Sequence, residues 1–212
     1  MLSPMATAVY LELGQKKVFA SALDWPGWSR SAKSEEEALE ALADYADRYR
    51  AVVDEIGVAF RPGSLDVVER VKGNATTDFG APAMAAKADS EPLTAKQASR
   101  MADLVAAAWT VLDRVAAQSP AELIKGPRGG GRDRDKMIAH VLDAEKAYLS
   151  KLGIKLKKPS LDEQRAAILD FLRAARAGEP AGEKKWLPRY GARRIAWHAL
   201  DHAWEMQDRT PA

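Results

Sequence analysis

The sequence predicts a small α+β module followed by an all-α four-helix bundle. Apolar and polar residues alternate over residues 7–13, as in a half-buried strand, and short apolar runs follow. From Thr94 onward the apolar residues recur at helical spacing, with breaks that leave four helices. Charge divides the chain in the same way, because residues 1–60 carry an acidic surplus and the remainder carries a basic one.

The N-terminal module is predicted over residues 1–73. The expected strands cover residues 7–13, 18–23, 28–33 and 64–71. The turn Asp24-Trp25-Pro26-Gly27 separates the second strand from the third. Ser34 followed by Glu37 forms a capping box, which predicts a helix that runs to about Ile56.

Residues 74–93 are rich in Gly, Pro, Thr and Ser and show no periodicity, which predicts a linker or a structured loop. The bundle is predicted over residues 94–212. Each of its helices is expected to begin at a capping residue or at a proline. The four expected starts are Thr94, Asp133, Ser160 and Pro188.

The composition is that of a globular protein: 212 residues, 47% hydrophobic and 29% charged, with a net charge of +2. The absence of cysteine excludes disulfides, thiolate metal ligands and a cysteine nucleophile. No secretory signal is visible, and no apolar run reaches the ~18 residues of a membrane helix. We therefore expect a cytoplasmic protein that binds no membrane. The lysines of residues 151–158 lack interleaved aromatic residues, so nucleic-acid binding is not expected.

The histidines carry the predicted chemistry. The chain has three, namely His140, His198 and His202. His198 and His202 are four residues apart on the last helix, so their imidazoles share one face. His140 lies in the apolar stripe of the second bundle helix. The pattern predicts one divalent metal ion with three imidazole ligands and an open coordination position. Zinc, nickel, copper and iron(II) all suit imidazole, and three hydrogen-bonded core histidines are the competing interpretation.

Charged residues extend the same face of the last helix. Arg194 precedes His198 by one turn and could hold a carboxylate through a bidentate contact. Glu205 could act as a base or could pair with Arg209. Arg194 and Glu205 are thus candidate catalytic residues, and Arg194 and Arg209 are candidate cofactor-binding residues. Asp143 and Asp201 are candidate acceptors for the free N–H of a ligand imidazole. The alternative for all of them is a solvated surface charge.

Two segments carry a resemblance to a known family. Residues 133–148, which contain His140, resemble the second helix of DinB-like proteins. Residues 197–209, which contain His198 and His202, resemble the later His-x-x-x-His helix of that superfamily. The resemblance implies a DinB-like four-helix bundle over residues 94–212, in which the three histidines match the family's metal ligands one for one.

The DinB-like superfamily includes mycothiol-dependent isomerases and bacillithiol S-transferases. The resemblance therefore implies a metal-dependent transferase or isomerase that uses a low-molecular-weight thiol, whose pKa the metal lowers. Zinc or nickel is the expected metal, with iron and manganese as alternatives, and a homodimer is expected by analogy. The chain departs from the family at Trp204 and Glu205, where an arginine–glutamine ending is common.

The N-terminal module is similar to another family. The strand and turn of residues 18–27, followed by Ser34-Glu35-Glu36-Glu37-Ala38-Leu39, resemble the HicB-like antitoxin domain. This resemblance implies a HicB-like binding or dimerisation module over residues 7–72. The alternative function is accordingly a non-enzymatic binding or stress-associated protein, whose HicB-like module recruits a protein partner. A plain turn is the simpler interpretation of residues 24–27.

Overall fold

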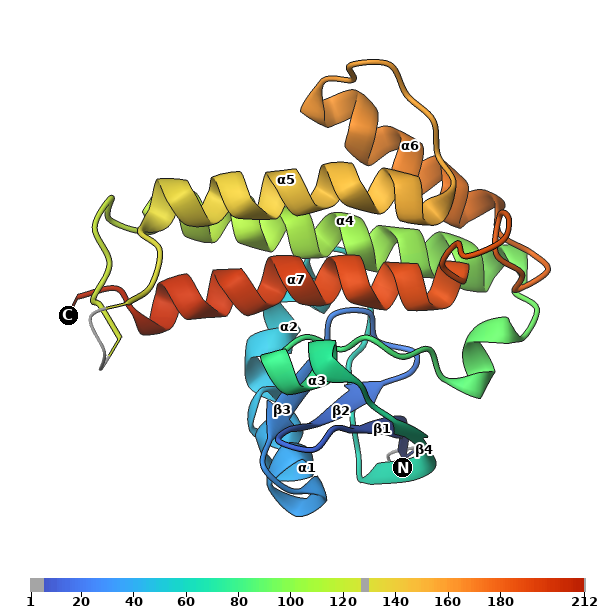
Figure 1. The fold of residues 1–212 in the computed structure, drawn as a ribbon, viewed down its shortest axis with the longest axis horizontal. Helices are drawn as coiled ribbons and strands as arrows, with labels where there is room; N and C mark the ends of the chain where they lie inside the picture. The colour runs from blue at the N-terminus through green and yellow to red at the C-terminus, as the bar shows by residue number, and fades with distance from the viewer. Residues whose placement is uncertain (1–5, 127–129, 212) are drawn as a thin grey trace.

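A computed structural model of the chain describes residues 6–126 and 130–211. Its N-terminal part contains a four-stranded sheet, and helices follow (Figure 1). The strands are β1 (Thr7–Leu13), β2 (Val18–Ala22), β3 (Ser29–Ala32) and β4 (Leu65–Lys72). Their order in the sheet is β3-β2-β1-β4, with β1 antiparallel to β2 and parallel to β4. All four lie where the apolar runs predicted strands.

The five helices predicted to begin at about Ser34, Thr94, Asp133, Ser160 and Pro188 are present, and three shorter helical segments were not predicted as separate elements. In chain order the helices are α1 (Glu35–Asp44), α2 (Ala46–Asp54), α3 (Ala75–Phe79), the 3-10 helix η1 (Lys87–Ser90), α4 (Ala95–Gln118), α5 (Arg134–Leu152), α6 (Leu161–Ala174) and α7 (Pro188–Asp208). The hydroxyl groups of Ser34, Thr94 and Ser160 accept hydrogen bonds from the backbone N–H three residues later, as capping boxes predict. The helix expected to reach Ile56 is divided at Tyr45 into α1 and α2.

Both faces of the sheet are covered. On one face Val9, Leu11 and Ala20 join Ala38 and Leu42 of α1 in the main hydrophobic core. The opposite face is covered by residues 74–93 and by α7. Since successive residues of a strand point to opposite faces, this double cover explains why β1 and β2 are buried along most of their length.

Residues 74–93 are held to β1 through a buried carboxylate. Glu12 is fully buried and accepts hydrogen bonds of 3.0 Å from the backbone N–H groups of Ala83 and Met84. It also accepts a hydrogen bond from the Thr77 hydroxyl. The Tyr10 hydroxyl donates to the Met84 carbonyl at 3.2 Å. This segment is therefore a structured part of the fold, with two short helices of its own.

The same segment is held to α7 by a buried ion pair. Asp89 is fully buried, and Arg193 is only 6% exposed. The two guanidinium Nη atoms each lie 2.5 Å from a carboxylate oxygen, in a bidentate contact. Arg193 also lies over the ring of Tyr10, with 5.0 Å between its Cζ atom and the ring centroid. Strand β1, η1 and α7 therefore meet at this pair.

The predicted fold class, an α+β module followed by a DinB-like all-α four-helix bundle, is wrong. Four C-terminal helices are present, but they do not enclose a core of their own. One continuous hydrophobic cluster extends from Val9 in β1 to Met206 in α7. Helix α7 packs against α4 and α5 and also against the N-terminal part, while α6 packs against α4 and α5 (Figure 1). The prediction failed because α7 is buried on nearly every side, whereas a bundle helix keeps one solvated face.

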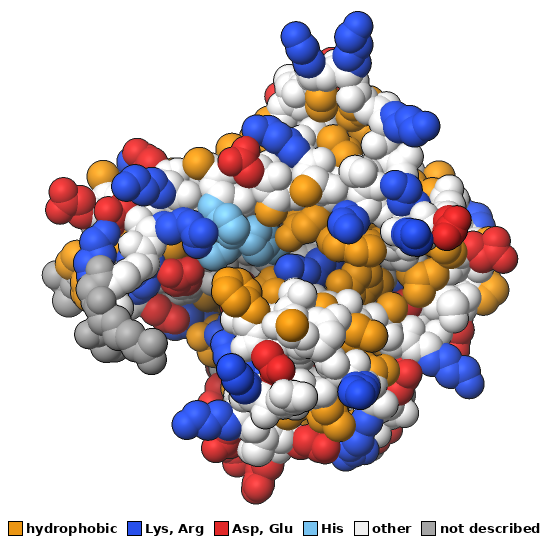
Figure 2. Space-filling view, in the orientation of Figure 1, with side chains coloured by type: hydrophobic (Ala, Val, Ile, Leu, Met, Phe, Trp, Pro, Cys, Tyr) orange, Lys and Arg blue, Asp and Glu red, His pale blue; other side chains and the backbone are white. Residues whose placement is uncertain are grey.

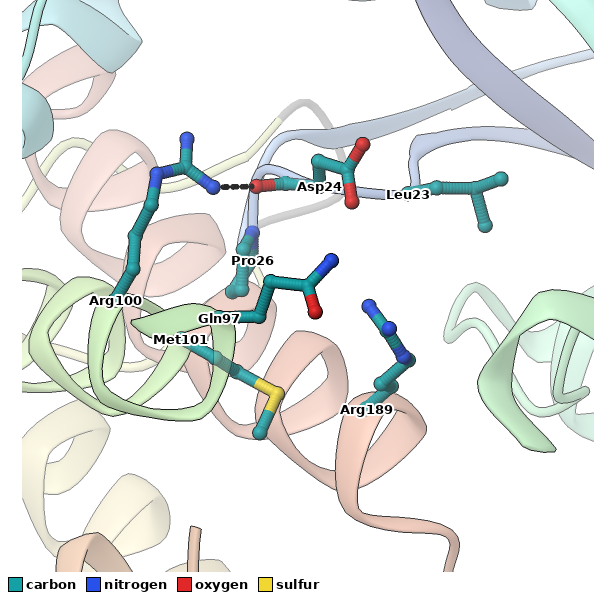
Figure 3. A pocket seen from close by; sticks show the side chains of 7 residues that line it. All are labelled: Leu23, Asp24, Pro26, Gln97, Arg100, Met101 and Arg189. Atoms are coloured by element: carbon teal, nitrogen blue, oxygen red, sulfur yellow. Dashed lines mark hydrogen bonds between the residues drawn. The ribbon is translucent and has the colours of Figure 1, made fainter. Parts of the chain in front are cut away.

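The turn of residues 24–27, which follows β2, packs against this shared core. Arg100 of α4 donates a hydrogen bond of 2.8 Å to the carbonyl oxygen of Asp24 (Figure 3), and its Cζ atom lies 4.2 Å from the Trp25 ring centroid. Gly27 lies against α7, where a β-carbon on it would be 2.5 Å from Cδ1 of Leu200. The turn thus contacts α4 and α7 together.

A side chain at Gly27 is expected to push this turn away from α7. Gly27 has φ +94°, which disfavours any β-carbon, and the added atoms would also meet Leu200. We expect Gly27→Val to lower the free energy of unfolding by roughly 2–4 kcal/mol, through overpacking and backbone strain, as measured by urea denaturation. Gly57→Val is the matched control, because Gly57 has φ +61° and no neighbour within 4 Å of the added β-carbon. Equal losses in both variants would contradict the packing argument.

Among residues 6–126 and 130–211, no helix combines the length and the apolar character that crossing a membrane requires.

Candidate metal centre

Three histidines converge between α5 and α7. Nε2 of His140, on α5, lies 3.3 Å from Nε2 of His198, on α7. One ring nitrogen from each of these residues and from His202 lies within 4.8 Å of the others. Two nitrogen ligands that each bind a tetrahedral zinc ion at ~2.0–2.1 Å are roughly 3.3 Å apart. The cluster therefore has the ligand type and the spacing to hold a metal ion, as the sequence predicted.

Glu205 fixes the orientation of one imidazole. Its Oε2 atom lies 3.0 Å from Nδ1 of His202. Its other oxygen accepts a hydrogen bond of 2.7 Å from Arg209, which also donates to the carbonyl of Ile124 at 2.7 Å. A proton on Nδ1 leaves Nε2 of His202 free to bind a metal. The hydrogen bond from His202, followed by the contact with Arg209, lowers the pKa of Glu205. Glu205 therefore stays ionised as an acceptor.

Replacing Glu205 tests whether this carboxylate orients the imidazole of His202. We expect Glu205→Gln to weaken zinc binding by roughly 10–100-fold, since outer partners of metal-bound histidines have effects of that size. The measurement is competition with a chromophoric zinc chelator. Asp201→Asn is the matched control, because Asp201 lies on the same helix but pairs with Arg30 at 2.8 Å. An unchanged zinc affinity in Glu205→Gln would contradict this role.

Burial favours the neutral form of two of the imidazoles, those of His140 and His198. His198 is 7% exposed and His202 is 9% exposed, whereas His140 is half-buried. Desolvation lowers the pKa of His198 to about 2, and His202 and Arg194 add to the effect. Desolvation, followed by the charge of Arg132, also lowers the pKa of His140. Neutral imidazole is the form that binds metals, so neither of these two ligands has to lose a proton at neutral pH.

The depressed pKa of His198 predicts a pH dependence for the metal-free protein. The unfolded chain binds a proton at this residue below pH ~6.5, whereas the folded chain does not, so stability falls as the pH drops below that value. His198 should contribute a slope of up to about 1.4 kcal/mol per pH unit near pH 5. Urea denaturation with a chelator present, at pH 7, 6 and 5, measures it. His198→Gln should flatten the dependence, and an unchanged slope would contradict the assignment.

The histidines reach the surface on one side of the molecule. Figure 2 shows their side chains between α5 and α7, with basic side chains on both sides and a hydrophobic hollow beside them. Arg194 lies one turn before His198, with its Cζ atom 4.6 Å from the Trp197 ring centroid and 5.9 Å from that of Tyr148. A small molecule could therefore approach the cluster from this face and meet a positive charge.

The predicted site residues divide into two groups. Arg194, Glu205 and Arg209 all lie near the histidines, although Arg209 reaches them only through Glu205. Asp143 is exposed and pairs with Lys146 at 3.0 Å, so it does not contact an imidazole. Asp201 pairs with Arg30 instead.

Sequence reasoning missed two aromatic features of the site. The sequence places Trp197 in the segment of residues 197–209 and Tyr148 at the end of the segment of residues 133–148, and it indicates no role for either ring. In the structure their rings flank both Arg194 and His198, with centroids 6.1 and 5.9 Å from the His198 ring. Tyr148 lies eight residues, about two turns, after His140, and this spacing was an available signal. Trp197 directly precedes His198, so spacing along the helix gave no signal for it.

No protein-family model matches the chain, and no curated protein or solved structure matches it either. The resemblances to DinB-like and HicB-like proteins therefore stay predictions. The functional argument rests on the geometry of the histidine cluster and on the side chains around it.

Proposed function

We propose that the protein holds a divalent metal ion through His140, His198 and His202 and uses it in transferase or isomerase chemistry with a small thiol. One observation supports the proposal above all others. Three imidazoles, two of them from consecutive turns of α7, bring their ring nitrogens within 4.8 Å of one another. Zinc and nickel are the first candidates for the ion, and iron and manganese are alternatives.

The surroundings favour a metal site over a purely structural cluster. One contact of 3.3 Å joins two of the imidazoles, between the Nε2 atoms of His140 and His198. Glu205, in contrast, accepts from His202 in the way that carboxylates accept from metal-bound imidazoles.

A divalent ion held by three imidazoles would supply Lewis acidity that lowers the pKa of a bound thiol. The chain's own residues would prepare the site for it. Glu205 holds His202 in the tautomer that presents Nε2, and the packed rings of Tyr148 and Trp197 hold His198. The positive charges of Arg194 and Arg132 favour an anion beside the cluster. In the reaction, the thiol proton passes to solvent and its sulfur forms a bond to an electrophilic carbon, which releases its leaving group.

The test is a thiol-transfer assay on tag-free protein loaded with zinc or nickel. A panel of small thiols is offered with 1-chloro-2,4-dinitrobenzene, whose chloride is displaced as the thioether forms. We expect one or more thiols to react faster with the loaded protein and not with His202→Ala. No acceleration by any thiol, with either metal bound in stoichiometric amount, would overturn the catalytic part of the proposal.

That negative result would favour the other hypothesis, recruitment of a protein partner through the N-terminal module. The turn of residues 24–27 in this module is only partly available to bind a protein partner. Asp24 is exposed, but Pro26 and Gly27 are buried against the helices. The structure thus gives this turn a packing function of its own.

A further inference from the structure

Arg194 is the arginine of α7 that makes no hydrogen bond or ion pair within residues 6–126 and 130–211. Its Nη1 atom is buried and has no hydrogen-bond partner among residues 6–126 and 130–211. The other arginines of this helix and its C-cap donate to a carbonyl or a carboxylate. Those contacts are Arg189 with Pro92, Arg193 with Asp89, and Arg209 with Glu205.

An acidic side chain does lie within electrostatic range of Arg194, but it is already engaged. Desolvation by burial raises the pKa of Glu12, and the charge of Arg194 is the smallest of the contributions that oppose this rise. The Glu12 carboxylate is fully buried and already accepts from the Thr77 hydroxyl and from two backbone N–H groups. Within the described chain no ion pair joins it to Arg194.

The guanidinium is held in a defined orientation. It stacks on Trp197, and Trp197 is fixed in turn by an edge contact with Phe19 of β2, with 5.9 Å between their centroids. Phe19, Ala81 and Trp197 form a separate buried cluster. The N-terminal part therefore builds the platform that positions Arg194. A guanidinium stacked on an aromatic ring keeps its N–H edge free for a planar anion.

Arg194 lies four residues before His198, which corresponds to about 6 Å along the helix axis. A ligand atom at the histidine cluster and an anionic group at Arg194 would therefore belong to one short molecule. A single guanidinium with aromatic neighbours matches a carboxylate, which it can bind with two parallel hydrogen bonds.

We propose that Arg194 binds the carboxylate of the small molecule whose thiol occupies the histidine cluster, so that the protein selects short carboxylate-bearing thiols. The inference deepens the proposed function and rests on it for the position of the thiol. The carboxylate contact itself depends only on Arg194 and its aromatic platform.

A matched pair of ligands tests the proposal on the zinc-loaded full chain. 3-Mercaptopropionate and its amide differ only in the charged group, and calorimetry gives the Kd of each. We expect the acid to bind tighter by on the order of tenfold or more, as a charge-assisted hydrogen bond provides. Arg194→Met should abolish this preference by weakening acid binding alone, and Arg194→Lys should retain part of it. Arg189→Met is the control and should keep the preference of the wild type.

Two results would overturn the inference. One is equal affinity for acid and amide in the wild type, and the other is a preference that Arg194→Met leaves intact. Zinc stoichiometry and the circular dichroism spectrum show whether each variant folds and holds metal.

If the proposed function is wrong, a different result is expected: zinc binds to the protein, but neither thiol does. Binding of propionate, which has no thiol, is then measured by ligand-observed nuclear magnetic resonance. Binding of propionate that Arg194→Met abolishes would uphold the carboxylate site. Propionate that does not bind, or that binds equally to both proteins, would overturn it.

Discussion

Replacing Asp89 with alanine is expected to lower the free energy of unfolding by roughly 3–5 kcal/mol, the range for breaking a buried ion pair by removing one partner. The variant leaves the Arg193 guanidinium buried at 6% exposure without its two carboxylate contacts. Burial of an unpaired charge has a high free-energy cost because the protein interior solvates it poorly. Urea denaturation followed by circular dichroism measures the loss.

The double variant Asp89→Ala, Arg193→Met separates this cost from simple loss of packing. Because it removes both charges, it should regain much of the stability that Asp89→Ala loses. Asp103→Ala is a suitable surface control, since Asp103 pairs with Arg173 at 3.1 Å where both side chains are more than 40% exposed. Its loss should stay within about 1 kcal/mol. Additive losses in the double variant would show that the buried pair is not the source of the effect.

Replacing His198 with alanine is expected to remove specific metal binding. His198 is the most buried of the three ligands and contacts His140 directly through Nε2. Loss of a direct ligand should exceed the roughly 10–100-fold effect of losing an outer partner such as Glu205. Competition with a chromophoric chelator measures the zinc affinity, and His140→Ala and His202→Ala should behave alike.

Arg189→Met is the control for these histidine variants, because Arg189 lies on α7 but donates to Pro92 and contacts none of the histidines in the described part. It should bind zinc as the wild type does. If one histidine could be removed without loss of affinity, the site would not be a three-histidine site.

The local structure could be predicted from the sequence because its causes are local. Ser34, Thr94 and Ser160 mark helix starts through hydroxyl caps that depend on the next three residues alone. The alternation over residues 7–13 predicted β1 for a similar reason. The fold class could not be predicted in this way. It depends on contacts such as Gly27 with Leu200, which periodicity within one helix does not report.

The histidine cluster could likewise be predicted from the sequence only in its local features. Spacing within α7 predicted that His198 and His202 share a face, and the apolar stripe of α5 placed His140 inward. The acceptor for His202 was not predicted as such, because Glu205 could equally have served as a base. The support of Arg194 by Trp197 and Phe19 was also missed, since it joins residues 19 and 197 and so depends on how the sheet lies against α7.

X-ray absorption spectroscopy on the zinc-loaded protein tests the central claim most directly, because it counts the imidazoles bound to the metal. The structure predicts one zinc per chain with three imidazole nitrogens at ~2.0–2.1 Å and a further non-protein ligand. Zinc that binds in less than stoichiometric amount, or a shell of oxygen ligands with fewer than three imidazoles, would contradict the assignment of His140, His198 and His202 as a metal centre.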